Sequence, residues 1–155
     1  MGREIRRVTK DWVHPIDDSG KPKPMYNEYY GDVLKQWISD NISWDNGTHK
    51  DLISDPSIKE RYPFYAMYHG DAPDINYYQI RRYTNEQLTH IQLYETTSEG
   101  TPLSPIFRAD DLDGLCEWAA SNATTFGRYT ATKEQWLKML SEDFVYHQEG
   151  RAIFL

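Results

Sequence analysis

Apolar residues recur with a helical period in the first third of the chain. Between residues 27 and 41 they fall on one broad stripe with a spacing of about 3.6 residues, which predicts an amphipathic helix. Asn27 is a suitable N-cap, and Glu28 lies close to the positive end of the helix dipole. The residues of the stripe are Tyr29, Tyr30, Val33, Leu34, Trp37 and Ile38.

The same period appears twice more near the C-terminus. We expect one helix to begin at Asp110 or Asp111 and to end near Asn122. A last helix is expected from Thr132, which has capping-box spacing to Gln135. The buried stripes are Leu112, Leu115, Cys116 and Ala119 on the first helix, and Trp136, Leu137 and Leu140 on the second.

Alternation of apolar and polar residues predicts a small sheet. Residues 90–97 form the clearest strand, because they are rich in β-branched and aromatic residues and place Ile91 and Leu93 on one face. Pro105 restricts the segment around it to the edge of a sheet. Weaker strands are predicted at residues 3–8, as a short edge strand, and at residues 103–107 and 151–155.

The segments between these elements are rich in turn residues. Residues 14–25 carry three prolines and a glycine and are predicted as loop. Residues 45–62 are polar and irregular, and we interpret them as a mobile insertion. Residues 63–83 are aromatic but interrupted by proline and glycine, which predicts an ordered loop or short strands packed by tyrosines. Thr84 and Gln87 have the spacing of a single capped helical turn.

Together these elements predict an α+β fold. We expect one small domain over residues 1–155, with a short antiparallel sheet and about three helices packed on it. Residues 1–25 form a mildly basic N-terminal arm and loop. A chain of 155 residues buries about two thirds of its unfolded surface, which suffices for a core without disulfides.

Charge and aromatic content add two expectations about binding and surface. The net charge is −7, and residues 86–155 hold 11 acidic but only 5 basic residues. An acidic body disfavours broad binding to nucleic acid, which depends on neutralising phosphates. The 12 tyrosines and 5 tryptophans are more than a small core needs, so many of them are expected at its edge or at an interface.

The single cysteine and the lack of long apolar runs indicate the cellular compartment. Cys116 is the single cysteine, so no intramolecular disulfide forms, and we interpret Cys116 as a small core residue in a reducing compartment. The N-terminus lacks the apolar stretch of a signal peptide, and no run approaches the roughly 20 apolar residues of a membrane span. The expectation is a cytoplasmic protein with no membrane partner.

The sequence contains no catalytic or cofactor motif that we recognise. The histidines at positions 14, 49, 69, 90 and 147 show no metal-ligand spacing, and no phosphate-binding glycine loop or nucleophile motif occurs. The carboxylate pair Asp17 and Asp18 fits a turn, and Asp110 and Asp111 fit a helix start. We therefore expect no cofactor and no metal, and favour a protein that is not an enzyme.

Two arginine doublets lie beside aromatic residues. Arg6 and Arg7 precede Trp12, whereas Arg81 and Arg82 precede Tyr83. Basic residues next to stacking platforms can bind a single strand or a phosphate. The negative net charge favours the other reading, in which each arginine pairs within its own chain.

Two stretches resemble an uncharacterised family of small proteins encoded by tailed phages and prophages. The first is Arg3-Glu4-Ile5-Arg6-Arg7-Val8 followed by Trp12, His14 and Pro15, and the second is the run from Tyr94-Glu95-Thr96-Thr97-Ser98-Glu99-Gly100 to Pro105. The resemblance implies an accessory protein acting in the cytoplasm of an infected or lysogenic bacterial host.

The second stretch has two readings. Gly100 and the prolines fit a stiffened turn between strands, which makes the segment architectural. An ordered loop on a rigid strand is also where binding surfaces lie. If it binds a partner, the expected contacts are Glu95, Ser98 and Glu99, together with Arg6, Arg7, Trp12, His14, Arg81 and Arg82.

The function expected from these observations is binding of a host or phage protein, with counter-defence inhibition as one form of it. Tyrosine and tryptophan dominate the hot spots of protein interfaces, which supports this reading. The alternatives are a nucleic-acid-associated factor, an unrecognised nuclease or hydrolase, and a minor virion or assembly component.

Overall fold

The computed structural model describes residues 2–97, 99–125 and 128–148, and it divides the chain into two compact units. The first, here called the sheet unit, contains residues 1–27 and 83–155. The second, here called the aromatic unit, contains residues 28–82. A four-stranded antiparallel sheet together with helices makes the protein α+β, which confirms the predicted class.

The sheet is built around one central strand. β1 (Arg3–Val8) pairs along its whole length with β2 (His90–Glu95), as the sequence predicts for both segments. Two short strands, β3 (Thr101–Pro102) and β4 (Phe107–Arg108), pair with opposite ends of β2. The predicted strand at residues 103–107 is therefore wrong in extent, because a proline has no N–H to donate to the ladder and the pairing is interrupted around Pro105.

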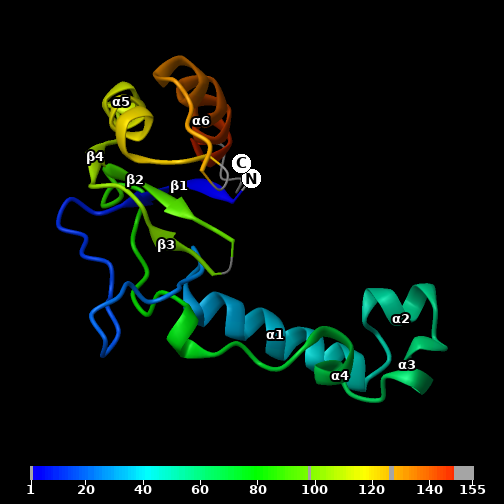
Figure 1. Cartoon of the computed structure of the whole chain (residues 1–155). Helices are drawn as coiled ribbons and strands as arrows, with labels where there is room; N and C mark the ends of the chain where they lie inside the picture. The colour runs from blue at the N-terminus through cyan, green and yellow to red at the C-terminus, as the bar shows by residue number, and fades with distance from the viewer. Residues whose placement is uncertain (1, 98, 126–127, 149–155) are drawn as a thin grey trace. The chain divides into compact units, whose positions relative to one another are not determined.

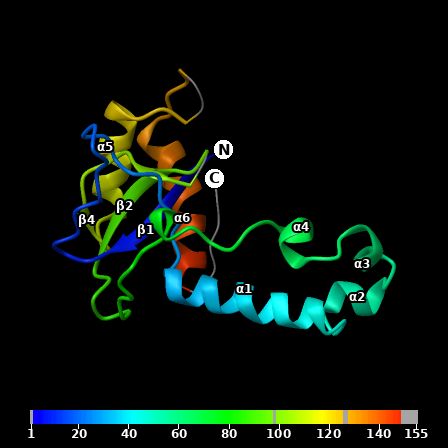
Figure 2. The same cartoon turned by 90° about the horizontal axis from the view of Figure 1, so that it is seen from below.

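Two helices pack on this sheet and close the main core. α5 (Leu112–Asn122) and α6 (Lys133–Gln148) lie beside each other in both views of the chain (Figures 1 and 2). Asp111 caps α5 by accepting a hydrogen bond from the Gly114 N–H, and α6 begins at the predicted capping box. The predicted strand at residues 151–155 lies outside the described residues. The core contains Ile5, Ile91, Leu93, Leu115, Cys116, Ala119, Trp136 and Leu140.

The aromatic unit is built from one long helix and several short ones. The helix predicted at residues 27–41 is present as α1 (Tyr30–Asp45), but its N-cap is Tyr29 and not Asn27. Residues 45–62, predicted as an irregular insertion, contain two short helices, whereas residues 63–83, predicted as ordered loop or short strands, are mostly loop around one short helix and one 3₁₀ turn. The short helices there are α2 (Lys50–Ser54), α3 (Ile58–Arg61), α4 (Tyr65–His69) and the 3₁₀ turn η1 (Ile75–Tyr77).

The core of the aromatic unit differs from the predicted stripe. Trp44, Leu52 and Tyr65 are buried, with Trp37 and Ile58 packed against them. The predicted stripe on α1 is only partly covered, and Ile38 is exposed. Among the described residues, no helix has the length and apolar character needed to cross a membrane.

Candidate protein-interaction surface

Three of the predicted site residues, Arg6, Trp12 and His14, meet on the second face of the sheet, which is the face opposite the apolar core. In the β1–β2 register, Glu4 lies opposite Tyr94 and Arg6 opposite Gln92, and directly paired residues point to the same side of a sheet. Ile5 and Leu93 point to the other side, into the apolar core. The second face therefore carries buried polar residues, and the loop after β1 brings Trp12 and His14 to them.

A chain of hydrogen bonds runs through the hydroxyl of Tyr94. Trp12 Nε1 donates to this hydroxyl over 3.1 Å, and the hydroxyl lies 2.8 Å from His14 Nδ1. His14 Nε2 lies 2.6 Å from the carbonyl oxygen of Lys23, which only accepts, so Nε2 carries the hydrogen and Nδ1 accepts from Tyr94. For the neutral ring, the contacts thus select the tautomer with its hydrogen on Nε2.

Burial of these hydrogen-bonded groups also shifts the pKa values of His14 and Tyr94. Burial lowers the pKa of His14, and the nearby Arg6 charge lowers it further, against the opposing effect of the hydrogen bond to Lys23. Burial raises the pKa of Tyr94 to about 12. Both groups are therefore neutral in the folded protein near pH 7, and they act as hydrogen-bond partners.

Arg6 is held inside the sheet unit from three directions. Its guanidinium donates to Glu4 Oε2 over 2.9 Å, to the Met25 carbonyl over 2.6 Å and to the Glu99 carbonyl over 3.0 Å. The same group lies 4.3 Å from the centre of the Tyr94 ring. The two stretches of the phage-family resemblance thus meet around Arg6 and Tyr94. These contacts favour the architectural interpretation of both, and we do not retain Arg6 or His14 as partner contacts.

The other predicted residues are dispersed. Arg7 donates to the Leu88 carbonyl, and Glu95 lies 3.8 Å from Arg3 Nη1. Arg82 pairs with Asp32 and lies over the Tyr29 ring. Arg81 is exposed and makes no ion pair with any described residue, and Ser98 lies outside the described residues.

Residues of catalytic type do not form a metal-ligand cluster in the part of the chain that the structure describes. Cys116 is buried in the core, and burial raises the pKa of its thiol to about 11. A thiol in that environment stays protonated and packs as a small apolar side chain, as its position on α5 predicts.

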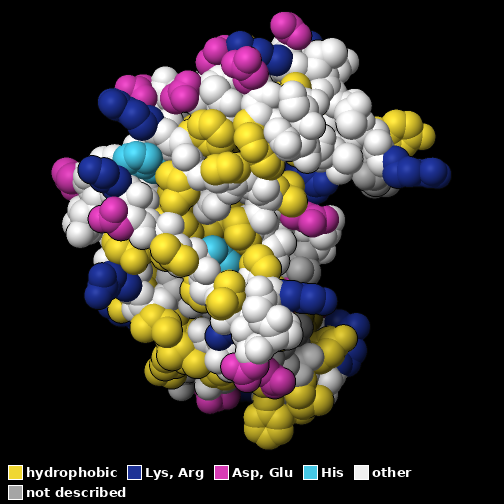
Figure 3. Space-filling model, turned by 60° about the vertical axis from the view of Figure 1, so that its left-hand side comes forward, with side chains coloured by type: hydrophobic (Ala, Val, Ile, Leu, Met, Phe, Trp, Pro, Cys, Tyr) yellow, Lys and Arg dark blue, Asp and Glu magenta, His cyan; other side chains and the backbone are white. Residues whose placement is uncertain are grey.

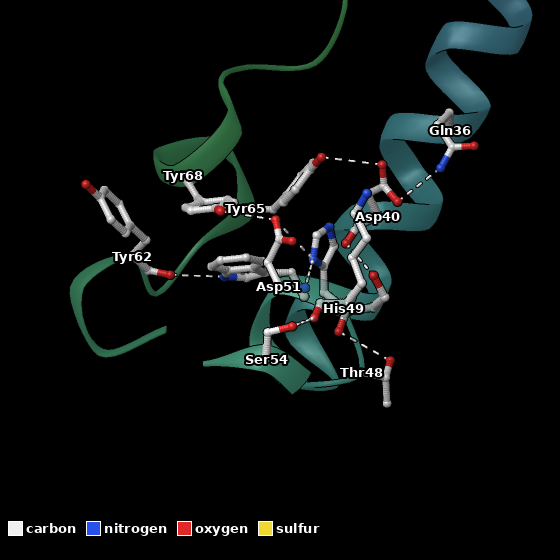
Figure 4. A network of polar contacts seen from close by, with 12 residues as sticks. Gln36, Asp40, Thr48, His49, Asp51, Ser54, Tyr62, Tyr65 and Tyr68 are labelled. Carbon is white, nitrogen blue, oxygen red and sulfur yellow. Dashed lines mark hydrogen bonds and ion pairs between the residues drawn. The ribbon is translucent and has the colours of Figure 1, made fainter. Parts of the chain in front are cut away.

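A second polar and aromatic cluster lies in the aromatic unit, and sequence reasoning missed it (Figure 4). Trp44 stacks on Tyr68 with ring centres 4.5 Å apart, and its Nε1 donates to the Tyr62 carbonyl over 3.0 Å. The Tyr65 ring lies 5.8 Å from that of Trp44 and 5.6 Å from that of His49. The rings therefore form one continuous cluster that joins α1, α2 and α4.

The polar tips of this cluster are bonded to one another. The Tyr65 hydroxyl lies 3.4 Å from Asp40 Oδ2, and the Tyr68 hydroxyl lies 3.1 Å from Asp51 Oδ2 (Figure 4). Burial, followed by the Asp40 charge, raises the pKa of Tyr65 to about 12. His49 Nδ1 accepts from the Asp51 N–H at the start of α2. These groups hold the short helices in place, which is a structural role.

The aromatic unit also exposes most of the large hydrophobic side chains at the surface. Of the fourteen that are exposed in the described part of the chain, ten belong to residues 28–82. Figure 3 views the chain from the left-hand side of Figure 1, where hydrophobic side chains also lie at the surface among charged ones. Exposure on this scale is typical of a surface that another molecule covers.

Four of these residues form a surface at α4, here called the α4 surface. Phe64, the N-cap of α4, and Met67, within the helix, are 65% and 56% exposed. Tyr68 follows Met67 in α4, and its ring lies 5.5 Å from that of Tyr62. Each of these two tyrosines is partly exposed. The α4 surface therefore combines aromatic rings and methionine, the residue types enriched in protein interfaces.

Comparison of the chain with family models, with curated proteins and with solved structures finds no match. The resemblance to a phage family stays a prediction, and the class that the structure defines is an α+β protein with an exposed aromatic surface.

Proposed function

We propose that the protein is an accessory factor of a phage or prophage that binds a host or phage protein through the α4 surface. The observation that carries this proposal is the exposure of Phe64 and Met67 beside two tyrosines, at and just before the short helix α4. Large apolar side chains of this kind gain free energy when a partner removes them from water. The partner that fits has an apolar pocket for Phe64 and Met67, with a hydrogen-bond acceptor beside it for the Tyr62 hydroxyl.

The packing of the α4 surface makes it suitable for binding. Tyr68 is backed by the buried Trp44 ring, and Tyr68 also bonds to Asp51. Side chains held in this way lose little conformational freedom when a partner docks, so more of the contact energy appears as affinity. This is the property expected of interface hot spots.

The arginine contacts support a protein partner over nucleic acid. Arg6, Arg7 and Arg82 each bond to groups of their own chain. Phosphate binding needs several cationic groups free to face one backbone. In the second doublet, Arg82 is paired, and Arg81 is exposed and forms no ion pair with a described residue. Arg81 therefore supplies only one free cationic group.

The proposal places the protein in the cytoplasm of an infected or lysogenic host, where a partner is either a host enzyme or another phage protein. Inhibition of a host defence protein is one action that such binding produces. It requires no chemistry from the bound protein, because occupation of the partner's functional surface is sufficient.

The test is quantitative affinity capture from host cells with the full chain. The variant Phe64→Ser with Met67→Ser is compared with a control that changes two exposed residues of the sheet unit, Val13→Ser with Ile16→Ser. We expect a partner captured by the wild type and the control to fall about tenfold or more with the α4 variant, since one hot-spot residue is typically worth at least about 1–2 kcal/mol. Equal capture by both variants would contradict the proposal.

A further inference from the structure

A second exposed stripe runs along α1, on a different side of the helix from Trp37 and Trp44. Lys35, Ile38, Ile42 and Asp45 follow one another at spacings of three, four and three residues, which is the spacing of a coiled-coil seam. Ile38 and Ile42 are 45% and 54% exposed. Trp37 and Trp44 face Tyr65 instead, so the packing inside the aromatic unit leaves this stripe uncovered among the described residues.

The order of charges along the stripe is self-complementary. Lys35 stands three residues before the isoleucine pair and Asp45 three residues after it. When two such helices run antiparallel, Ile38 of one lies opposite Ile42 of the other, and Lys35 opposite Asp45. A two-fold axis repeats each contact, as an isologous interface requires.

The charged ends of the stripe are exposed, and at one of them Lys59 Nζ donates to the backbone carbonyl of Asp45 over 2.9 Å. Lys35 and Asp45 are both exposed, and neither side chain forms an ion pair with another residue in the described ranges. A parallel arrangement would place Lys35 against Lys35 and Asp45 against Asp45, which is repulsive at both ends. The charges therefore select the antiparallel pairing.

We propose that α1 is a self-association helix, which pairs antiparallel with α1 of a second copy of this chain. The helix has 16 residues and spans about 24 Å. So short a seam buries less surface than a standard stable interface, and the expected dimer is weak, with a dissociation constant of about micromolar order. Self-association is independent of the α4 surface and doubles the number of α4 surfaces in one particle.

The experiment is sedimentation equilibrium of the purified full chain over a range of concentrations. Three single variants are measured: Lys35→Glu, Asp45→Lys and a control, Lys50→Glu. The control makes the same charge change as Lys35→Glu, but on α2. We expect the first two to weaken the dimer about tenfold or more, because two attractive pairs become two repulsive ones, and the control to associate like the wild type. Circular dichroism of each variant confirms that the helices remain folded.

The decisive measurement mixes the two weakened variants. The chain with Lys35→Glu has an acidic residue at both ends of the stripe, and the chain with Asp45→Lys has a basic residue at both ends, so a mixed antiparallel pair has two attractive contacts. We expect the mixture to recover wild-type association, with a dissociation constant within about threefold. A wild-type chain that stays monomeric, or a mixture that stays dissociated, overturns the proposal. The Phe64→Ser, Met67→Ser variant is expected to dimerise normally, so failure here and failure of the proposed partner binding are distinguishable.

Discussion

The two units of this protein solve the problem of covering apolar surface in different ways. In the sheet unit, aliphatic residues of β1 and β2 are covered by α5 and α6, and the opposite face is filled by a bonded polar cluster around Tyr94. In the aromatic unit, only Trp44, Leu52 and Tyr65 form the buried centre. A small core cannot cover all the large side chains around it, so the aromatic unit leaves many of them in water.

This difference indicates which unit stabilises the fold and which unit carries the interaction surfaces. Buried polar groups that are bonded on several sides hold a single arrangement, as Arg6 and His14 do in the sheet unit. The aromatic unit instead places its bonded tyrosines at the edge of its core, where the rings also reach the surface. The sheet unit keeps its bonded polar groups inside, and the aromatic unit carries both proposed interaction surfaces.

The largest effect that tests this contrast comes from Trp44→Ala. Trp44 is fully buried and touches most of the rings of its small core, so its truncation is expected to cost about 3–5 kcal/mol. Because few other contacts hold the aromatic unit, we expect residues 28–82 to lose protection in hydrogen exchange, while β1 and β2 keep theirs.

The matched control is Trp136→Ala, since Trp136 is equally buried but lies in the larger core of the sheet unit. It is expected to lower protection in α5, α6 and the sheet. If Trp44→Ala lowered protection equally in both units, the separation of their stabilities would be refuted.

A smaller effect is expected from Gly100→Ala, which tests the polar face of the sheet unit. Gly100 has φ of +122°, and a Cβ there would also collide with the Arg6 guanidinium. Backbone strain of this kind costs about 1–3 kcal/mol, measured as a lower free energy of unfolding. Gly20→Ala is the control, because Gly20 has φ of +85° but open space around it. An equal cost at both glycines would show that contact with Arg6 contributes nothing.

A third prediction concerns pH and the neutral His14. In the unfolded chain this histidine titrates near its ordinary value of 6.5, whereas burial lowers its pKa in the folded protein. As the pH falls through that ordinary value, the unfolded state binds the proton first, so the free energy of unfolding decreases until the pH is below the folded pKa. The stability that neutral His14 supports is thus fully present only above its unfolded pKa.

His14→Gln tests this directly. Glutamine can still donate to the Lys23 carbonyl but does not titrate, so we expect a cost of about 1 kcal/mol near neutral pH for the lost contact with Tyr94. Chemical denaturation from about pH 7.5 to about pH 5 should then show a flatter decline for the variant than for the wild type. Parallel curves would show that His14 does not govern acid sensitivity in this range.

Sequence reasoning succeeded where periodicity is long or local chemistry is strong. The stripes of α5 and α6, the capping box at Thr132 and the β1 and β2 strands are all present in the structure. It failed for α2, α3 and α4, which have four or five residues each. Helices that short show no full period and form only through tertiary contacts, here the rings around Trp44.

The candidate sites differ in the same manner. The histidine at position 14 and the arginine at position 6 were singled out from the sequence, but their meeting at Tyr94 depends on strand register and on a long loop, which no spacing reveals. The α4 surface was missed because the sequence alone does not show whether an apolar side chain is buried or exposed. A signal was available in the density of aromatic residues between positions 62 and 68.

The smallest effect is expected at Ile53, and its neighbour makes the comparison sharp. Leu52 is 3% exposed and Ile53 is 70% exposed, so two adjacent side chains of α2 have opposite environments. Ile53→Ala is expected to change the free energy of unfolding by no more than about 0.5 kcal/mol, as for other surface substitutions. Leu52→Ala removes a buried side chain and should cost about 2–5 kcal/mol in the same denaturation assay. A large cost at Ile53 would mean that this side chain is covered in solution, and if that cost grew with protein concentration, the cover would be a second copy of the chain.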